Sequence, residues 1–169
     1  MCLWGDYMLN IYTVSFFGHR EVSNFFLAEE QVENLIRELL YSKEYVDFLV
    51  GRNGDFDQIV SSTIIRVKKD CGEENCSHIL MLPYSTKEYR DNIKAFYEYY
   101  DLVDIYTNAD RVHYKSVIQK RNQDMVDRSD LVVFYLERDF GGAYQTYRYA
   151  LKQEKNILKL PIEYYSTKR

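Results

Sequence analysis

Short apolar runs alternate with longer amphipathic segments along the whole chain. Six of the short runs are rich in β-branched and aromatic residues and predict buried strands, at 11–17, 45–50, 79–82, 102–106, 131–136 and 157–160. Between them, apolar residues recur at helical spacing at 25–41, 58–69, 86–99, 116–127 and after Gly142. Strands that alternate with helices in this way predict an α/β fold: a Rossmann-like, doubly wound, mainly parallel sheet with helices on both faces.

The turn after the fifth predicted strand is the first candidate for a ligand-binding site. A polar stretch at 137–140 separates that run from Gly141 and Gly142, and the helical pattern resumes at Ala143. A glycine turn at a helix N-terminus leaves backbone N–H groups unpaired and accessible. Such a turn suits an anion, above all a phosphate.

Two more glycine-bearing loops follow strand runs, at 18–20 and 51–57. In a doubly wound sheet, ligands bind beyond the carboxyl ends of the strands, where the strand order reverses. We therefore expect the three loops to meet at one edge of the sheet. The predicted ligand-binding residues are Gly18, His19, Arg20, Gly51, Asn53, Gly54, Asp55, Arg121, Asn122, Gly141, Gly142 and Ala143.

The polar residues in this set have different expected roles. Arg20 is expected to pair with the phosphate, and Asp55 to accept hydrogen bonds from ribose hydroxyls. His19 is either a turn histidine bonded to nearby backbone or a ligand contact and proton donor. Asp57 stands where the N-cap of a helix beginning at Gln58 belongs, with a role at the ligand as its alternative.

Arg121 and Asn122 belong to the fourth predicted helix. This helix could aim both side chains over the ligand. The alternative is a basic helix face that lies in solvent.

Length and charge limit the function classes. The 169 residues suffice for one domain, with its core at about 11–161, and the formal net charge is −4. An acidic chain has no global field that attracts nucleic acid, so a nucleic-acid partner is predicted to be unlikely. No stretch is apolar enough for a membrane span or a signal peptide, which favours a cytoplasmic location.

The three cysteines and the many tyrosines give weaker indications. Cys71, Cys76 and His78 have zinc-like spacing but no fourth ligand nearby, so we predict no metal site and interpret this stretch as a surface loop after a helix. The chain has 17 tyrosines and one tryptophan. Tyrosine-rich segments at 95–100 and 144–149 could form a homo-oligomer interface, or they could simply pack on the sheet.

Four motifs in order, FFGHR at 16–20, VGRNGDFD at 50–57, KRNQDMVDRSD at 120–130 and FGGAYQ at 140–145, resemble the SLOG superfamily. That superfamily includes the DNA-processing protein A and Lonely Guy proteins, and this chain is most similar to its bacterial single-domain members of the YpsA-like type. The resemblance covers 13–160. It implies a Rossmann-like fold whose glycine loops bind a nucleotide-like or nucleotide-sugar ligand.

The resulting functional hypothesis is a sensor or regulator that binds a nucleotide-like, nucleotide-sugar or ADP-ribose-like small molecule and requires no cofactor. Lonely Guy enzymes, which cleave nucleoside monophosphates at the N-glycosidic bond, carry a glutamate a few residues after the glycine turn. No glutamate occurs here between Gly142 and Ala150. The alternative, an N-glycosidase or phosphoribohydrolase, would use Asp55 or Asp57 as its carboxylate. Whether the chain is an enzyme is left open.

Overall fold

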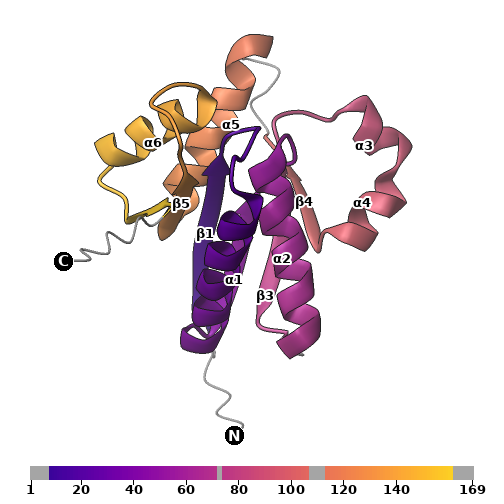
Figure 1. The fold of residues 1–169 in the computed structure, drawn as a ribbon. Coiled ribbons are helices and arrows are strands. Elements are labelled where there is room, and N and C mark those ends of the chain that lie inside the picture. The colour runs from indigo at the N-terminus through magenta and orange to yellow at the C-terminus, as the bar shows by residue number, and fades with distance from the viewer. Residues whose placement is uncertain (1–7, 72–73, 107–112, 162–169) are drawn as a thin grey trace, which may run out of the picture.

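Six parallel strands form a single sheet with helices on both faces, as predicted (Figure 1). The computed structural model describes residues 8–71, 74–106 and 113–161, apart from the side chains of Tyr114 and Lys115. Cys2 and the ends of the predicted 1–169 domain lie outside the described residues. The strands are β1 (Ile11–Gly18), β2 (Tyr45–Val50), β3 (Cys76–Leu82), β4 (Leu102–Ile105), β5 (Leu131–Tyr135) and β6 (Ile157–Leu160).

The strand order is β4-β3-β2-β1-β5-β6, so β1 lies between β2 and β5 and the order reverses there. The connecting helices are α1 (Phe25–Ser42), α2 (Asp55–Cys71), α3 (Lys87–Asp91), α4 (Ile93–Tyr99), α5 (Tyr114–Arg128) and α6 (Gly142–Lys152). Because every strand is parallel, all carboxyl ends lie at one edge of the sheet.

The core has two halves, one on each face of the sheet. Neighbouring residues of a strand point to opposite faces, so Phe16 packs with α1 and α2, whereas Phe17 packs toward α5 and α6. In β2, Phe48 likewise packs in the first half of the core and Leu49 in the second. This double burial explains why the strands are continuous apolar runs without alternation.

The third strand begins three residues before its predicted start at 79. Cys76 and His78 are both buried in β3, and Cys71 lies exposed at the end of α2. The polar side chain of His78 hid the strand in the sequence, but its Nε2 atom lies 2.8 Å from Ser61 Oγ on α2 and so has a partner inside the protein. The interpretation of this stretch as a surface loop is therefore wrong for Cys76 and His78, which belong to β3. No group of three potential metal ligands occurs within the described ranges.

The predicted helix at 86–99 is divided in two. Thr86 caps α3, with its Oγ1 atom accepting from the Tyr89 N–H at 3.1 Å. The backbone at Asn92, with φ −134° and ψ 34°, leaves the helical region and separates α3 from α4. Every helix in the described part of the chain is too short or too polar to span a membrane.

Replacing Gly18 by alanine is expected to destabilise the fold by about 1–3 kcal/mol. An added Cβ would overlap the ring of Phe56, which is fully buried and stacked on Tyr135 with 5.4 Å between ring centroids. Gly142→Ala is the matched control because, within the described part of the chain, an added Cβ there meets no atom within 4 Å. Denaturant unfolding of the two variants measures the difference. Equal stabilities would contradict the close contact.

Candidate functional site

Three loops meet at the carboxyl edge of the sheet and enclose a cavity of about 410 Å³. They follow β1, β2 and β5, which are neighbours in the sheet. All of the predicted ligand-binding residues line the cavity except Gly54 and Asp55. Asp57, Arg138 and four apolar residues, Phe16, Phe17, Ile118 and Met125, complete its lining. The structure thus brings together loops that are far apart in the sequence, whereas their role in binding stays a prediction.

Gly54 and Asp55 join the first two loops beneath the cavity. The Asp55 N–H donates to the Arg20 carbonyl at 2.8 Å, and the Asp55 carboxylate accepts from the Val22 N–H at 3.0 Å. Gly54 lies so close to this loop that an added Cβ would be 2.7 Å from the Arg20 Cα. Asp55 therefore holds the loop after β1 in place, and its carboxylate is occupied by backbone.

Asp57 lies inside the first turn of α2, because the helix begins at Asp55. Its expected position as the N-cap of a helix starting at Gln58 is therefore wrong. The carboxylate still satisfies a free backbone donor, since it accepts from the Asn53 N–H at 2.9 Å. Burial raises the pKa of Asp57, and the positive charge of Arg121 opposes that shift.

Arg121 is buried at the base of the cavity and does not extend over it from solvent. Only 8% of the residue is exposed. Its guanidinium donates to the Met81 carbonyl at 2.6 Å and to Asn122 Oδ1 at 2.9 Å, and burial lowers its pKa. Asn122 is buried too, and its amide donates to Thr146 Oγ1 at 3.3 Å. The pair fixes α5 against β3 and α6 while lining the cavity.

His19 is 5% exposed, and its Nε2 atom has no hydrogen-bond partner among the residues that the structure describes. Burial, with the nearby charge of Arg138 as the second cause, lowers the pKa of His19. The Glu137 charge and a hydrogen bond to the Arg138 backbone oppose this shift. His19 is therefore bonded to loop backbone, as one of its two sequence interpretations expects, and it lines the cavity, so a ligand contact stays a prediction.

The N-terminus of α6 opens onto the cavity. Gly141 precedes the helix with φ 95°, a conformation that favours glycine, and no side chain caps the first turn. An added Cβ at Gly141 or Gly142 would meet no atom of the described residues within 4 Å, which leaves the approach to the helix open on their side. Uncapped N–H groups and the helix dipole together favour an anion at this position.

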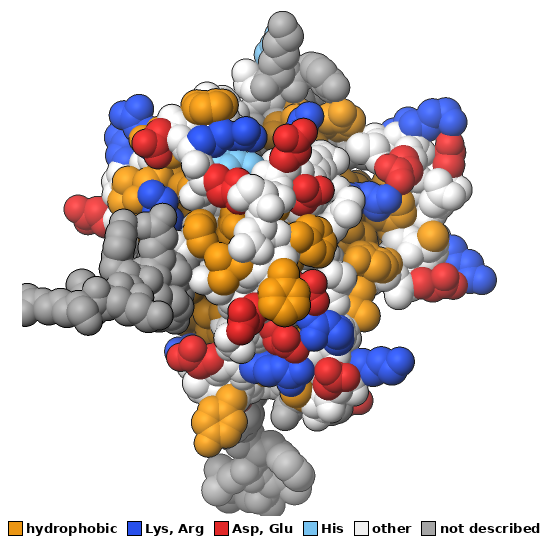
Figure 2. Space-filling model, viewed as in Figure 1, with side chains coloured by type: hydrophobic (Ala, Val, Ile, Leu, Met, Phe, Trp, Pro, Cys, Tyr) orange, Lys and Arg blue, Asp and Glu red, His pale blue; other side chains and the backbone are white. Residues whose placement is uncertain are grey.

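Arg138 was not among the predicted residues. It is exposed on the turn after β5, lines the cavity, and holds its guanidinium 5.1 Å from the ring centroid of Phe140. The sequence could have indicated this residue, because Arg138 lies two positions before Phe140, which directly precedes the glycine turn. Figure 2 shows basic, acidic and hydrophobic side chains around a histidine at the end of the molecule where β1 ends.

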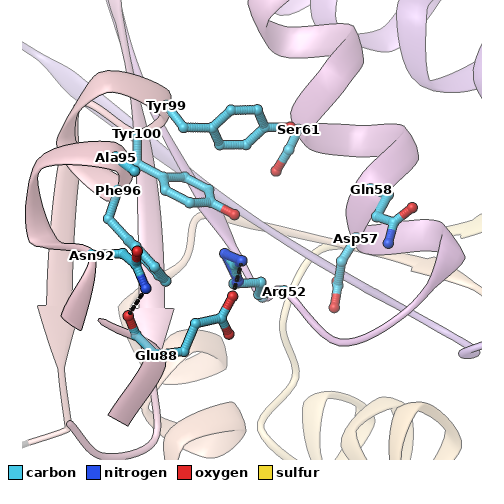
Figure 3. A pocket seen from close by; sticks show the side chains of 11 residues that line it. Arg52, Asp57, Gln58, Ser61, Glu88, Asn92, Ala95, Phe96, Tyr99 and Tyr100 are labelled. Carbon is cyan, nitrogen blue, oxygen red and sulfur yellow. Dashed lines mark hydrogen bonds and ion pairs between the residues drawn. The ribbon is translucent and has the colours of Figure 1, made fainter. Parts of the chain in front are cut away.

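A second cavity, of about 510 Å³, lies between α2 and α4 and was not predicted (Figure 3). It shares Gly51 and Asp57 with the first cavity. Its other lining residues are Arg52, Gln58, Ser61, Glu88, Asn92, Ala95, Phe96, Tyr99 and Tyr100. The tyrosine-rich segment at 95–100, expected as an oligomer interface, thus supplies one wall of a cavity. The oligomer itself stays a prediction.

No protein-family model and no curated protein matches the chain. Among solved structures, the chain is similar to DNA processing protein A from Helicobacter pylori, described for its single-stranded DNA binding mode, with a TM-score of 0.62 and 18% identity. That match covers 91% of this chain and 67% of the other. For DNA processing protein A from Streptococcus pneumoniae the TM-score is 0.60 and the identity 14%. There the match covers 92% of this chain but about half, 52%, of the other.

These neighbours confirm the expected Rossmann-like fold and correct two expectations about the ligand. Both are DNA processing protein A, and at 18% and 14% identity the likeness shows a shared fold, so membership of the SLOG superfamily stays a proposal. The expected small-ligand sensor, with its N-glycosidase alternative, is not supported, because the neighbour with a described ligand binds single-stranded DNA. The same finding corrects the prediction that nucleic acid is an unlikely partner. The net charge of −4 does not exclude a nucleic-acid partner, because it sums the whole surface, whereas Arg20 and Arg138 both line one cavity.

Replacing Arg138 by alanine is expected to raise the pKa of His19, because the guanidinium charge disfavours the imidazolium. NMR titration of the ring protons measures this directly, since the chain has only three histidines. Burial lowers the pKa of His78 to about 4, which separates its signal from that of His19. Arg148→Ala, on the exposed surface of α6, is the control. An unchanged His19 pKa in Arg138→Ala would contradict the predicted proximity.

Proposed function

We propose that this chain binds single-stranded DNA at the cavity formed by the loops after β1, β2 and β5. The observation that carries the proposal is the uncapped N-terminus of α6, which lies at the same cavity as the exposed arginines Arg20 and Arg138. A neighbour with the same fold is described as binding single-stranded DNA, which supports the proposal.

A phosphate of the strand would lie on the first N–H groups of α6. Arg20 and Arg138 would add charge-assisted hydrogen bonds from the loops after β1 and β5. Asp57 is the one acidic residue among the described residues that line this cavity. The positive charge of Arg121 acts on the Asp57 carboxylate and opposes part of its negative charge.

The exposed ring of Phe140 is the reason to propose single-stranded rather than double-stranded DNA as the ligand. It is 65% exposed directly before the glycine turn, and the Arg138 guanidinium lies over its ring. An unpaired base can stack on an exposed ring beside a bound phosphate, whereas the bases of a duplex are stacked on each other. Aromatic and cationic groups side by side are typical of surfaces that bind single strands.

Two finer assignments stay proposals. The YpsA-like type within the superfamily rests on the sequence motifs at 16–20, 50–57, 120–130 and 140–145. A cytoplasmic location rests on the sequence alone and is consistent with DNA as the partner.

Replacing Arg20 or Arg138 by alanine is expected to weaken binding of a single-stranded oligonucleotide about tenfold, because each loses one charge-assisted contact. Each variant should also reduce the slope of log affinity against log salt by about 0.7. Fluorescence anisotropy across a salt series measures both quantities.

Lys94→Ala is the control for this experiment, because the Lys94 side chain is 91% exposed on α4 and does not line the cavity. Its affinity and salt slope should match those of the wild type. A wild-type protein that shows no salt-dependent retention of the oligonucleotide would refute the proposed function.

Replacing Phe140 by alanine tests stacking separately from charge. We expect the affinity for a single strand to fall by roughly fivefold to a hundredfold, while the salt slope stays unchanged. Tyr41→Ala is the control, since Tyr41 is 94% exposed near the end of α1. If Phe140→Ala binds like the wild type, the strand does not stack on this ring.

A further inference from the structure

We propose that the second cavity, between α2 and α4, receives one unstacked nucleobase of the same DNA strand whose phosphate lies at α6. This inference rests on the proposed function and adds a base-binding site to it. The cavity volume of about 510 Å³ falls within the range of about 300–1,000 Å³ typical of sites for small organic groups.

One wall of the second cavity is aromatic. Figure 3 shows Phe96, Tyr99 and Tyr100, all from α4 and the residue after it, on the same side of the cavity. The rings support one another, with 4.7 Å between the centroids of Tyr99 and Tyr100 in an edge-to-face arrangement. Phe96 and Tyr100 are buried, but Tyr99 is 44% exposed. Tyr99 can therefore offer ring surface to an incoming planar group without unpacking the core.

The opposite wall is polar and rigid. Asp57, Gln58 and Ser61 come from the first two turns of α2 and line the cavity on the side opposite the aromatic rings (Figure 3). Ser61 Oγ is fixed by its hydrogen bond to His78 Nε2, and Asp57 by its bond to the Asn53 N–H. The Gln58 amide has both a donor and an acceptor group. A nucleobase has a flat face for stacking and an edge of donors and acceptors, which matches these two walls.

The charges at this cavity favour a neutral guest. Arg52 lies over the Phe96 ring at 4.4 Å and pairs with Glu88 at 2.7 Å, so the cation at the mouth is already neutralised. The remaining acid is Asp57, whose pKa is raised by burial. A phosphate would find no unpaired cation among these lining residues. An uncharged base suits the balance of charge, whereas the first cavity, with Arg20 and Arg138, suits the phosphate.

The two cavities are neighbours on one surface. Gly51 and Asp57 line both, and the loop that carries Arg52 and Asn53 lies between them. A strand that lies on the first cavity can therefore place a nearby base in the second by crossing this single loop. That continuity favours a base of the bound strand over an unrelated guest.

The test compares an oligothymidylate with an abasic strand of equal length, which keeps the sugar–phosphate chain and lacks every base. In the full chain, Tyr99→Leu removes the stacking ring but keeps an apolar side chain. We expect Tyr99→Leu to bind the oligothymidylate at least about fivefold more weakly and the abasic strand as the wild type does. Tyr99→Phe should restore wild-type affinity for both. Tyr41→Leu is the matched control and should change neither affinity.

Every other outcome contradicts the base site, and the pattern of binding shows whether the proposed function fails as well. If the wild type binds the oligothymidylate and Tyr99→Leu binds it equally well, the base site is wrong and the proposed function stands. If Tyr99→Leu weakens both strands equally, Tyr99 acts on the backbone or the fold, and the base site is again wrong. If the wild type binds neither strand at low salt, the proposed function fails, and the base site fails with it.

Discussion

The parallel alignment of β1 with two neighbours is the constraint on which the rest of the structure depends. β1 pairs with β2 on one side and with β5 on the other, although β5 follows more than a hundred residues later in the chain. Because both pairings are parallel, the segments that leave these strands emerge at the same edge. The cavity, its arginines and the open end of α6 are consequences of that pairing. The continuous apolar strands stabilise it through burial on both faces.

Charge in this protein is arranged locally. The chain is acidic overall, and much of its surface carries mixed ion pairs, such as those that join Glu33 to Arg37 and to Arg66. At the first cavity the balance differs, because Arg20 and Arg138 are exposed and the nearby charge of Arg121 opposes that of the Asp57 carboxylate. A phosphate at a short distance responds to this local arrangement far more than to the net charge, because salt screens charges beyond about 8–10 Å.

The sequence predicted the sheet and most of the first cavity because those features are local. Buried runs such as 11–17 identify strands, and a glycine turn after a strand marks a place where a ligand can approach backbone. Features that depend on tertiary partners were missed. The start of β3 at Cys76 was hidden because His78 looks polar until its contact with Ser61 is known. The second cavity depends on how α4 faces α2, and nothing in the period of either helix shows that Tyr99 forms a wall.

Gly51 and Asp57 line both cavities. This sharing limits which amino-acid substitutions the protein can accept at these two positions. A Cβ at Gly51 would stand 3.0 Å from a carboxylate oxygen of Asp57, so even alanine presses on the neighbouring side chain. A displacement of that carboxylate alters the shape of two compartments at once and disturbs its bond to Asn53. Substitutions at these two positions therefore cannot tune one compartment independently. A change that affects one cavity alone has to occur at a residue that lines only that cavity.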